Sequence, residues 1–373
     1  MFSRGDGILN KDLNDIDYQY HNNIKSQGGF TLYKIISLGK TSMIAVMLTL
    51  VLLLSACGQA ANQGNAPAST SAEVAKSTNN DSVVASSEPA TDAEYWTYES
   101  DKGPVQIPRN PQRVVIPVQD FIGDLLTLGV TPIAVAGNDI LNHPYFKEAL
   151  TGVEVVGDDM TVSLEKITSL EPDLIITYQE DTYEQISKIA PTVFIPWGKY
   201  DYKERLIEIG KILNKEQQAV KWVADFNQKL EAKKAELADL IAADKKVAIF
   251  EIAGKELYLY GSSYGRGGEI IYNGLGLHAP DLVQEAAFKE GWASLSLEAL
   301  PEYLGEADYI FQGFSRGVEQ DKLDILDSVF WQSLPAVKAG HVFTYDLKTY
   351  YLSDAYALDK QLDEIVTLLK SLQ

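Results

Sequence analysis

The residues best suited to binding a small molecule are concentrated in the stretch Tyr258–Gly268, with the sequence Tyr-Leu-Tyr-Gly-Ser-Ser-Tyr-Gly-Arg-Gly-Gly. Successive side chains of a strand point to opposite faces, so Leu259 is predicted to face the core while Tyr258 and Tyr260 face away from it. Tyrosine offers flat contact area and a hydroxyl at little cost in conformational entropy. The strand therefore predicts an aromatic surface on the face opposite the core.

The glycine-rich turn after this strand carries Tyr264 and Arg266, directly before a predicted helix. Arginine is always charged and presents a planar fork of donors that suits oxyanions. The spacing favours two interpretations equally: a ligand-binding turn, or an ordinary aromatic hairpin with an arginine at its turn.

A second aromatic group precedes the last predicted helix. Its members are Tyr345, Tyr350, Tyr351 and Tyr356, with Lys348 among them. Neighbouring side chains point in different directions in most local geometries, so one tyrosine of the group can anchor the helix while another contacts a ligand.

Three residues in the first half of the chain directly follow predicted strands. Ligands of open α/β sheets bind beyond the carboxyl ends of the strands. By this rule Gln119, Tyr178 and Trp197 are predicted to line a binding cleft.

Histidines give no sign of a catalytic or metal site. His21, His143, His278 and His341 lie far apart without ligand spacing. The sequence also has no His-x-x-x-His pair and no Gly-x-x-x-x-Gly-Lys-Ser/Thr phosphate loop. These observations indicate a binding protein rather than an enzyme, with no resident metal or cofactor.

Short apolar segments alternate with amphipathic segments along most of the chain, which predicts parallel sheets covered by helices. The first lobe is predicted over residues 95–213 and the second over 244–373. The predicted strands are Val105–Pro108, Arg113–Pro117, Ile133–Ala136, Val153–Val156, Leu174–Thr177, Val193–Pro196, Val247–Ile252, Glu256–Gly261, Tyr309–Phe311 and Val342–Tyr345. The predicted helices are Phe121–Leu128, Leu164–Leu170, Tyr183–Ile189, Tyr202–Leu213, Gly268–Leu275 and Asp354–Leu372, and Ala253-Gly254-Lys255 marks a hairpin.

One long helix is predicted over 214–243, between the two lobes. Val220, Phe226, Leu230 and Leu237 follow the three-and-four spacing of one helical face, and Asn214 is placed to cap the first turn. At 1.5 Å per residue the helix would be roughly 40 Å long. Its predicted role is a rigid strut that joins the lobes.

The amino-terminal segment, 1–57, ends in a signal sequence. Lys34 and Lys40 precede the apolar run Met43–Leu54, which is too short to span a membrane. The only cysteine, Cys57, follows Leu54-Ser55-Ala56 as in the lipobox of bacterial lipoproteins, where the thiol is lipidated and becomes the mature amino terminus. Residues 58–94, rich in Ala, Ser, Thr and Asn, are predicted to be a flexible tether. A formal net charge of −20 argues against nucleic-acid binding.

Residues 95–373 resemble the solute-binding lipoproteins of bacterial iron–siderophore ABC importers, which have a single helical backbone between two lobes. The motifs that carry the resemblance are Tyr264-Gly265-Arg266-Gly267-Gly268-Glu269, Gly291-Trp292-Ala293 and Thr349-Tyr350-Tyr351-Leu352-Ser353-Asp354, and they are most similar to the ferric-hydroxamate branch. The implied fold is α/β, with two Rossmann-like lobes joined by one long helix.

The resemblance also implies roles for individual residues. Tyr258, Tyr264, Arg266 and Tyr351 match positions that contact the ferric complex, although relatives often have Trp at the positions of Tyr264 and Tyr351. One glutamate per lobe docks on arginines of the permease in this family, and Glu165 and Glu298 match them. These two lie in segments that echo each other, Ser163-Leu164-Glu165 and Ser296-Leu297-Glu298, each followed by an Asp-initiated strand.

The implied protein is a monomer, lipid-anchored on the outer face of the cell membrane, that delivers a ferric siderophore to an ABC permease and its ATPase. Few cations are predicted in the pocket, Arg266 with Lys348 or Arg316 as a second, and burying unpaired charge is costly. Hydroxamate or citrate-hydroxamate complexes are therefore favoured. Haem or cobalamin is the alternative ligand for the same fold, and an extracellular enzyme is the alternative class.

Overall fold

The computed structural model describes residues 94–137, 139–158, 161–242, 244–315, 318 and 324–371. All of them belong to one compact unit, Asp92–Gln373. The predicted signal segment, Cys57 and the tether up to residue 93 lie outside the described residues, as does Arg316. Among the described residues, no helix combines the length and apolar character needed to cross a membrane.

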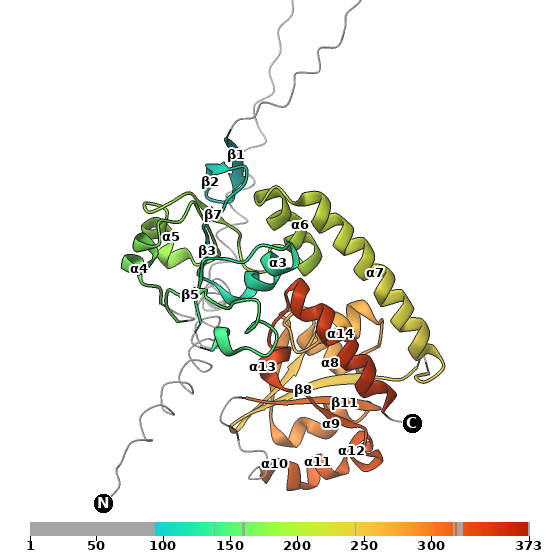
Figure 1. Cartoon of the computed structure of the whole chain (residues 1–373). Helices are drawn as coiled ribbons and strands as arrows, with labels where there is room; N and C mark the ends of the chain where they lie inside the picture. Colours follow the sequence, from blue (N-terminus) through green and yellow to red (C-terminus); the bar gives the residue numbers. More distant parts are fainter. Residues whose placement is uncertain are drawn as a thin grey trace, which may run out of the picture. The chain divides into compact units, whose positions relative to one another are not determined.

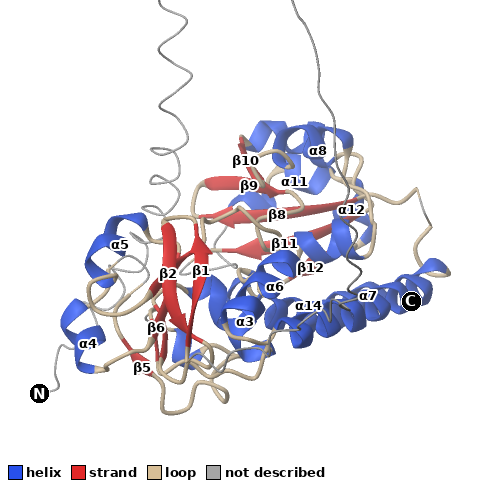
Figure 2. Ribbon diagram, turned by 90° about the horizontal axis from the view of Figure 1, so that it is seen from above, coloured by secondary structure: helices blue, strands red, loops and turns tan. Residues whose placement is uncertain are grey.

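The first lobe is built on a parallel five-stranded sheet, as predicted, in the order β5-β4-β3-β6-β7 (Figures 1 and 2). Each strand falls within or beside its predicted range, because short apolar runs can be buried on both faces only in such a sheet. An antiparallel hairpin of β1 and β2 precedes it, and β1 was not predicted. The strands are β1 (Tyr95–Ser100), β2 (Gly103–Pro108), β3 (Val114–Ile116), β4 (Ala134–Val135), β5 (Glu154–Val155), β6 (Leu174–Thr177) and β7 (Thr192–Phe194). The helices are η1 (Gln119–Phe121), α3 (Ile122–Thr127), η2 (Ile140–Asn142), α4 (Leu164–Ser169), α5 (Glu180–Ile186) and α6 (Tyr202–Ile212).

The second lobe has a mixed sheet in the order β10-β9-β8-β11-β12. The predicted hairpin is confirmed: β8 and β9 are antiparallel, and Gly254 in their turn has φ +64°, which glycine adopts readily. β10, which pairs with β9 at the sheet edge, was not predicted. The strands are β8 (Val247–Ala253), β9 (Glu256–Tyr260), β10 (Trp292–Leu295), β11 (Tyr309–Phe314) and β12 (Val342–Thr344). The helices are η3 (Glu269–Gly274), α8 (Asp281–Ala287), η4 (Leu297–Ala299), α9 (Leu300–Leu304), α10 (Asp324–Asp327), α11 (Val329–Ser333), α12 (Pro335–Ala339), α13 (Leu347–Tyr350) and α14 (Ala355–Lys370).

The long connecting helix, α7 (Glu216–Ala238), is shorter than the predicted 214–243. Asn214 does not cap it: this residue has φ +56°, a left-handed conformation outside the helix, and Lys215 occupies the capping position. Phe226, Leu230 and Leu237 form the buried face as predicted, whereas Val220 is half exposed. With 23 residues, the helix is roughly 35 Å long.

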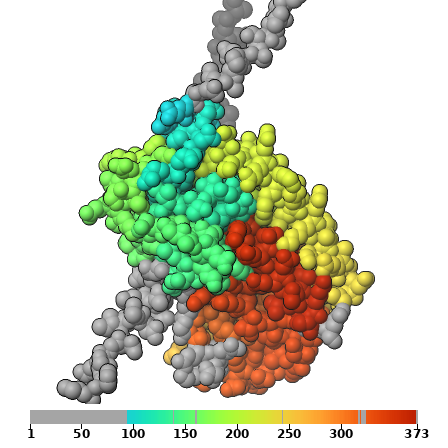
Figure 3. Space-filling view, viewed as in Figure 1, coloured from blue at the N-terminus to red at the C-terminus, as the bar shows by residue number. Residues whose placement is uncertain are grey.

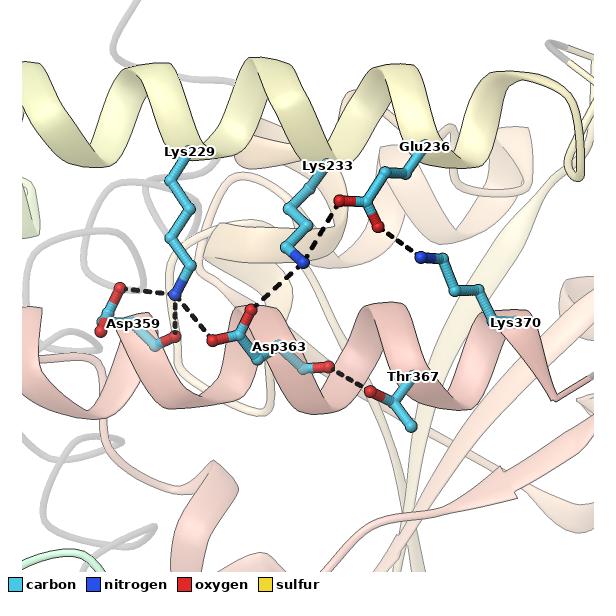
Figure 4. A network of polar contacts seen from close by, with 7 residues as sticks. All are labelled: Lys229, Lys233, Glu236, Asp359, Asp363, Thr367 and Lys370. Atoms are coloured by element: carbon cyan, nitrogen blue, oxygen red, sulfur yellow. Dashed lines mark hydrogen bonds and ion pairs between the residues drawn. The ribbon is translucent and has the colours of Figure 1, made fainter.

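The closing helix α14 lies beside α7, and ion pairs join the two (Figures 1 and 4). Lys229 Nζ lies 2.9 Å from Asp359 Oδ1 and 2.7 Å from Asp363 Oδ2. Lys233 lies 3.5 Å from Asp363, and Lys370 of α14 pairs with Glu236 of α7 (Figure 4). Each of these partly exposed pairs contributes little alone, but together they fix the rotation of α14 against the strut.

The amino end of α14 belongs to the core of the first lobe. Leu352, Ala355 and Ala357 are buried in the same apolar cluster as Ile116 and Leu174 of the first sheet. In the space-filling view, the red surface of the carboxyl-terminal segment lies directly against the teal surface of the first lobe (Figure 3). The last part of the chain therefore joins both lobes.

Candidate functional site

A cleft of about 550 Å³ is lined by segments of both lobes. From the first lobe it is bordered by Ile195–Lys203, the segment that follows β7, and from the second by Ser262–Tyr264, which follows β9. The first segment follows a parallel strand, as the rule for open α/β sheets requires, whereas the second follows β9, which is antiparallel to β8. The volume lies within the range of small-molecule sites.

Two of the residues predicted from the sequence meet across this cleft. The rings of Trp197 and Tyr264 are 5.7 Å apart at an interplanar angle of 72°. Trp197 is 47% exposed, whereas Tyr264 is buried. Because one ring comes from each lobe, a flat or apolar surface in the cleft can contact both.

The remaining predicted ligand contacts do not line the cleft in this state. The Tyr258 ring packs at 5.7 Å on Trp292, and the Tyr178 hydroxyl donates to Asp120 at 2.7 Å. Gln119 lies in the short helix η1. Their predicted contact with a ligand stays a prediction.

Arg266 is buried rather than displayed on a turn. It is 1% exposed, and its Nε donates to Glu251 Oε2 at 3.0 Å. Its guanidinium carbon lies 4.4 Å from the ring centre of Tyr260 and 4.8 Å from that of Tyr351. Tyr260 is also fully buried, so the prediction that it faces away from the core is wrong: the buried cation and its carboxylate partner occupy the space beside it.

The two aromatic stretches singled out in the sequence contact each other here. The backbone N–H of Arg266 donates to the Tyr350 carbonyl at 2.5 Å. At Gly265, φ is +69°, and a Cβ would lie 2.4 Å from the carbonyl oxygen of Tyr351. Only glycine permits this approach, which explains why the turn has glycine at that position.

A buried cluster that the sequence analysis missed lies at the junction of the lobes. Arg205 lines the cleft, and its Nε donates to Asp124 Oδ2 at 2.6 Å while Nη2 donates to the Ser353 carbonyl at 3.0 Å. The second oxygen of Asp124 accepts the N–H of Ala355, the first residue of α14, at 3.0 Å. Only Asp354 could have been noticed in the sequence, because it stands at the capping position before an apolar helix. Arg205 lies in an amphipathic helix, where a charged residue is ordinary.

The start of α6 places Arg205 at the cleft. Asp201 Oδ1 accepts the N–H groups of Lys203 at 2.8 Å and Glu204 at 2.9 Å, and the Glu204 side chain accepts the Asp201 N–H in return. This capping box fixes the first turn of the helix. Arg205 lies in that turn, so its direction is set locally.

Asp124 and Asp354 share the environment of one arginine. Burial raises the pKa of both, with Arg205 opposing the rise at Asp124. Both oxygens of Asp124 accept hydrogen bonds, whereas Oδ2 of Asp354 has no partner among the described residues. The geometry therefore assigns the negative charge to Asp124 and the proton to Asp354, whose pKa is about 8.

Glu269 adds a buried carboxyl to the cleft wall. Its Oε1 accepts the N–H of Gly265 at 3.1 Å, and Oε2 has no partner within the described part of the chain. Burial raises its pKa above the ordinary value. The cleft thus combines aromatic walls with acidic and basic groups in comparable number.

One hydrolase-like spacing, Gly-x-Ser-x-Gly, occurs at Gly261–Gly265, so the expectation of a sequence without this motif is wrong. Ser263 is exposed in the cleft, but the described lining contains no histidine that could act as its base. The described residues also contain no cluster of three or more His, Cys, Asp or Glu placed to hold a metal ion. The arrangement suits non-covalent binding of a small molecule.

Comparison with known proteins gives the class of protein to which this site belongs. Residues 114–349 match the model of the periplasmic binding protein family. The chain is a member of this family, and its fold is that of the two-lobed, helical-backbone binding proteins.

The relatives define a narrower group. The chain is 38% identical over 291 residues, 77% of this chain and 90% of the relative, to the iron(3+)-hydroxamate-binding protein FhuD of Bacillus subtilis. It is 34% identical over 332 residues, 88% of this chain and 95% of the relative, to the iron(3+)-hydroxamate-binding protein YxeB of the same organism. The structure of FhuD2 from Staphylococcus aureus with bound ferrioxamine B aligns with a TM-score of 0.64 at 30% identity, covering 70% of this chain and 100% of that one.

Removing the cation of the buried Arg266–Glu251 ion pair should destabilise the protein. Arg266→Ala leaves a buried carboxylate uncompensated, so it should lower the free energy of unfolding by about 3–5 kcal/mol, measured by urea denaturation. Replacing both partners, Arg266→Met with Glu251→Gln, should restore much of the loss. An Arg266→Ala protein within 1 kcal/mol of wild type would contradict a structural role for the pair.

The raised pKa of Asp354 should make the free energy of unfolding depend on pH. The folded protein holds a proton on Asp354 up to a pKa of about 8, whereas the unfolded chain releases it near 3.8. Wild-type stability should therefore lose a contribution as the pH rises from 4 to 8. Asp354→Asn cannot titrate, so its stability relative to wild type should increase over that range in urea unfolding. A difference that stays constant with pH would refute the protonated state.

Proposed function

We propose that this protein captures a ferric siderophore of the hydroxamate or citrate-hydroxamate type and delivers it to an ABC permease with its ATPase. The observation that carries the proposal is the aromatic pair Trp197–Tyr264, one ring from each lobe, in a cleft whose described lining contains no histidine. The relatives named for iron(3+)-hydroxamate binding support the same ligand class.

The charges of the cleft favour a ligand with little net charge. Arg205 is paired with Asp124, and Lys289 with Glu290 at 3.3 Å. Arg266 is neutralised behind the wall by Glu251. A complex with several negative charges would find no unpaired buried cation within the described lining, whereas a wrapped, neutral chelate can be desolvated there at lower cost.

The predicted ligand residues fall into three groups. Trp197 and Tyr264 contact the complex directly. Arg266 lies behind this wall, with its guanidinium carbon 5.7 Å from the ring centre of Tyr264 and 4.8 Å from that of Tyr351. The remaining proposed contacts, Tyr258, Tyr178 and Gln119, do not line the cleft in this structure, so they require side-chain rearrangement around the ligand.

Titration of tryptophan fluorescence tests the ligand class. Ferric trihydroxamates, a ferric citrate-hydroxamate, a ferric tris-catecholate, haem and cobalamin are added in turn to the purified protein. Saturable quenching by hydroxamate complexes is expected, and it should diminish in Trp197→Phe. Tyr264→Ala should weaken binding about tenfold or more through lost contact area. Tighter binding of haem or cobalamin than of any siderophore would overturn the proposal.

Glu165 and Glu298 are proposed to dock on the permease. Both are exposed, Glu165 in the first turn of α4 and Glu298 in η4. Each lies in a helical segment that leads to an interior strand of the sheet, β6 or β11. The aspartates before these strands act alike: Asp173 accepts the N–H of Arg113 at 2.9 Å, and Asp308 that of Lys246 at 2.9 Å. The echo in the sequence thus marks equivalent positions, which would present one carboxylate per lobe.

The protein is proposed to act on the outer face of the cell membrane as a monomer anchored through lipidated Cys57. This residue lies outside the described part of the chain. The segment 58–94 is the proposed tether between the anchor and the folded body.

A double variant should lose docking on the permease but keep binding of the ferric complex. Glu165→Ala with Glu298→Ala removes two exposed carboxylates that do not line the cleft, so the dissociation constant for the ferric complex should stay within twofold of wild type. Uptake of the iron complex by cells that carry the cognate permease should fall strongly, because charge-assisted contacts are lost. Glu180→Ala, another exposed first-turn carboxylate, is the matched control. Normal uptake by the double variant would disprove the docking role.

A further inference from the structure

Arg205 is a mostly buried cation of the cleft, and its pairing bears on ligand choice. Its side chain is 12% exposed. Of the other described cations of the lining, Lys289 is 88% exposed beside Glu290, and Lys203 is partly buried and donates to the uncharged side chain of Asn227 of α7. Arg205 differs from both because it is paired with a fully buried carboxylate, Asp124.

The hydrogen bonds of Arg205 leave part of its donor fork available. A guanidinium has five N–H donors, and Arg205 uses Nε for Asp124 and one Nη2 donor for the Ser353 carbonyl. Phe121, which also lines the cleft, lies 5.5 Å from the guanidinium carbon. The remaining donors are held in a fixed orientation for an acceptor in the cleft.

The charge of Arg205 is cancelled by Asp124. Asp124 is fully buried and does not line the cleft, and both its oxygens are occupied, one by Arg205 and the other by the N–H of Ala355. The pair offers the cleft hydrogen-bond donors without a net positive charge. Such a surface binds neutral carbonyl and hydroxamate oxygens but gives an anionic complex no Coulombic compensation for lost hydration.

We propose that Asp124 is a positioning residue that sets the charge preference of the cleft: by neutralising Arg205 it makes the site select uncharged ferric complexes over anionic ones. The inference rests on the proposed function and specifies its ligand class. Selection of this kind works by withholding a favourable contact from the wrong ligand.

The test compares ligands of different charge on one variant. Asp124→Asn is made in an Asp354→Asn background, so that the neighbouring carboxyl cannot ionise in its place. It keeps an acceptor for the Ala355 N–H and leaves Arg205 without its paired charge. Dissociation constants are measured by fluorescence for an uncharged ferric trihydroxamate and for an anionic ferric citrate-dihydroxamate. Wild type should prefer the uncharged complex. In Asp124→Asn the ratio of the two constants should shift about tenfold toward the anionic complex, because an unpaired guanidinium lies at the cleft. The shift should shrink at high salt.

Two further variants separate charge from folding. Asp354→Asn alters the neighbouring carboxyl, which is equally buried and carries the proton, so the ratio at pH 7 should not change. Asp124→Asn with Arg205→Gln removes both charges and should return the ratio toward the wild-type value. A merely structural defect would weaken both ligands alike and leave the ratio constant.

Failure of the proposed function and failure of the role of Asp124 give different results in these measurements. A wild-type protein that binds neither ferric complex refutes the proposed function. A wild-type preference for the anionic complex overturns the inference even if Asp124→Asn does not fold. An unchanged ratio in folded Asp124→Asn, or an equal shift in Asp354→Asn, also overturns it while leaving siderophore binding intact.

Discussion

The contact on which the rest of this structure depends is the seating of the last helix on the first lobe. Asp124 holds the backbone N–H at the start of α14 and the Arg205 side chain at once, so one buried carboxylate joins helix α3, helix α6 and the carboxyl-terminal segment. The two segments are closely packed at this contact, because a Cβ on Gly123 would lie 1.8 Å from Asp354 Oδ1. The cleft lies directly over it, because Arg205 and Ser353 belong to both the joint and the cleft wall.

A second buried pair, Arg266 with Glu251, supports the other wall. The two pairs have the same design, an arginine neutralised by an acid from a different element, yet they differ in access. Arg205 reaches the cleft, whereas Arg266 lies beneath Tyr264 and Tyr351. A buried ion pair is weak evidence for stability in itself, but two neutralised arginines next to one cleft keep its electrostatic potential low, which accords with an aromatic site for a wrapped metal complex.

Much of the fold could be predicted because the strands of the first lobe are short apolar runs between turn residues, and periodicity identifies such segments directly. β1 and β10 were missed because both mix polar and aromatic residues at a sheet edge. Asn214 was misplaced because a left-handed asparagine after a helix and a capping asparagine before one look identical in sequence. In the site, Trp197 and Tyr264 were found from strand ends and a glycine-rich turn. The members of the Asp124–Arg205 pair are 81 positions apart in the sequence, so only the tertiary structure brings them together.

The ion pairs between α7 and α14 have a kinetic consequence. α14 is fixed to the strut by Lys229 and Lys233 along its length and to the first lobe at its start. A lobe that turned as a rigid body about α7 would have to break both attachments at once. Ligand entry is then governed by side chains at the cleft mouth, such as half-exposed Trp197, rather than by a slow domain motion. Association under these conditions is a single bimolecular step, and differences in affinity between ligands arise mainly in how long each one stays.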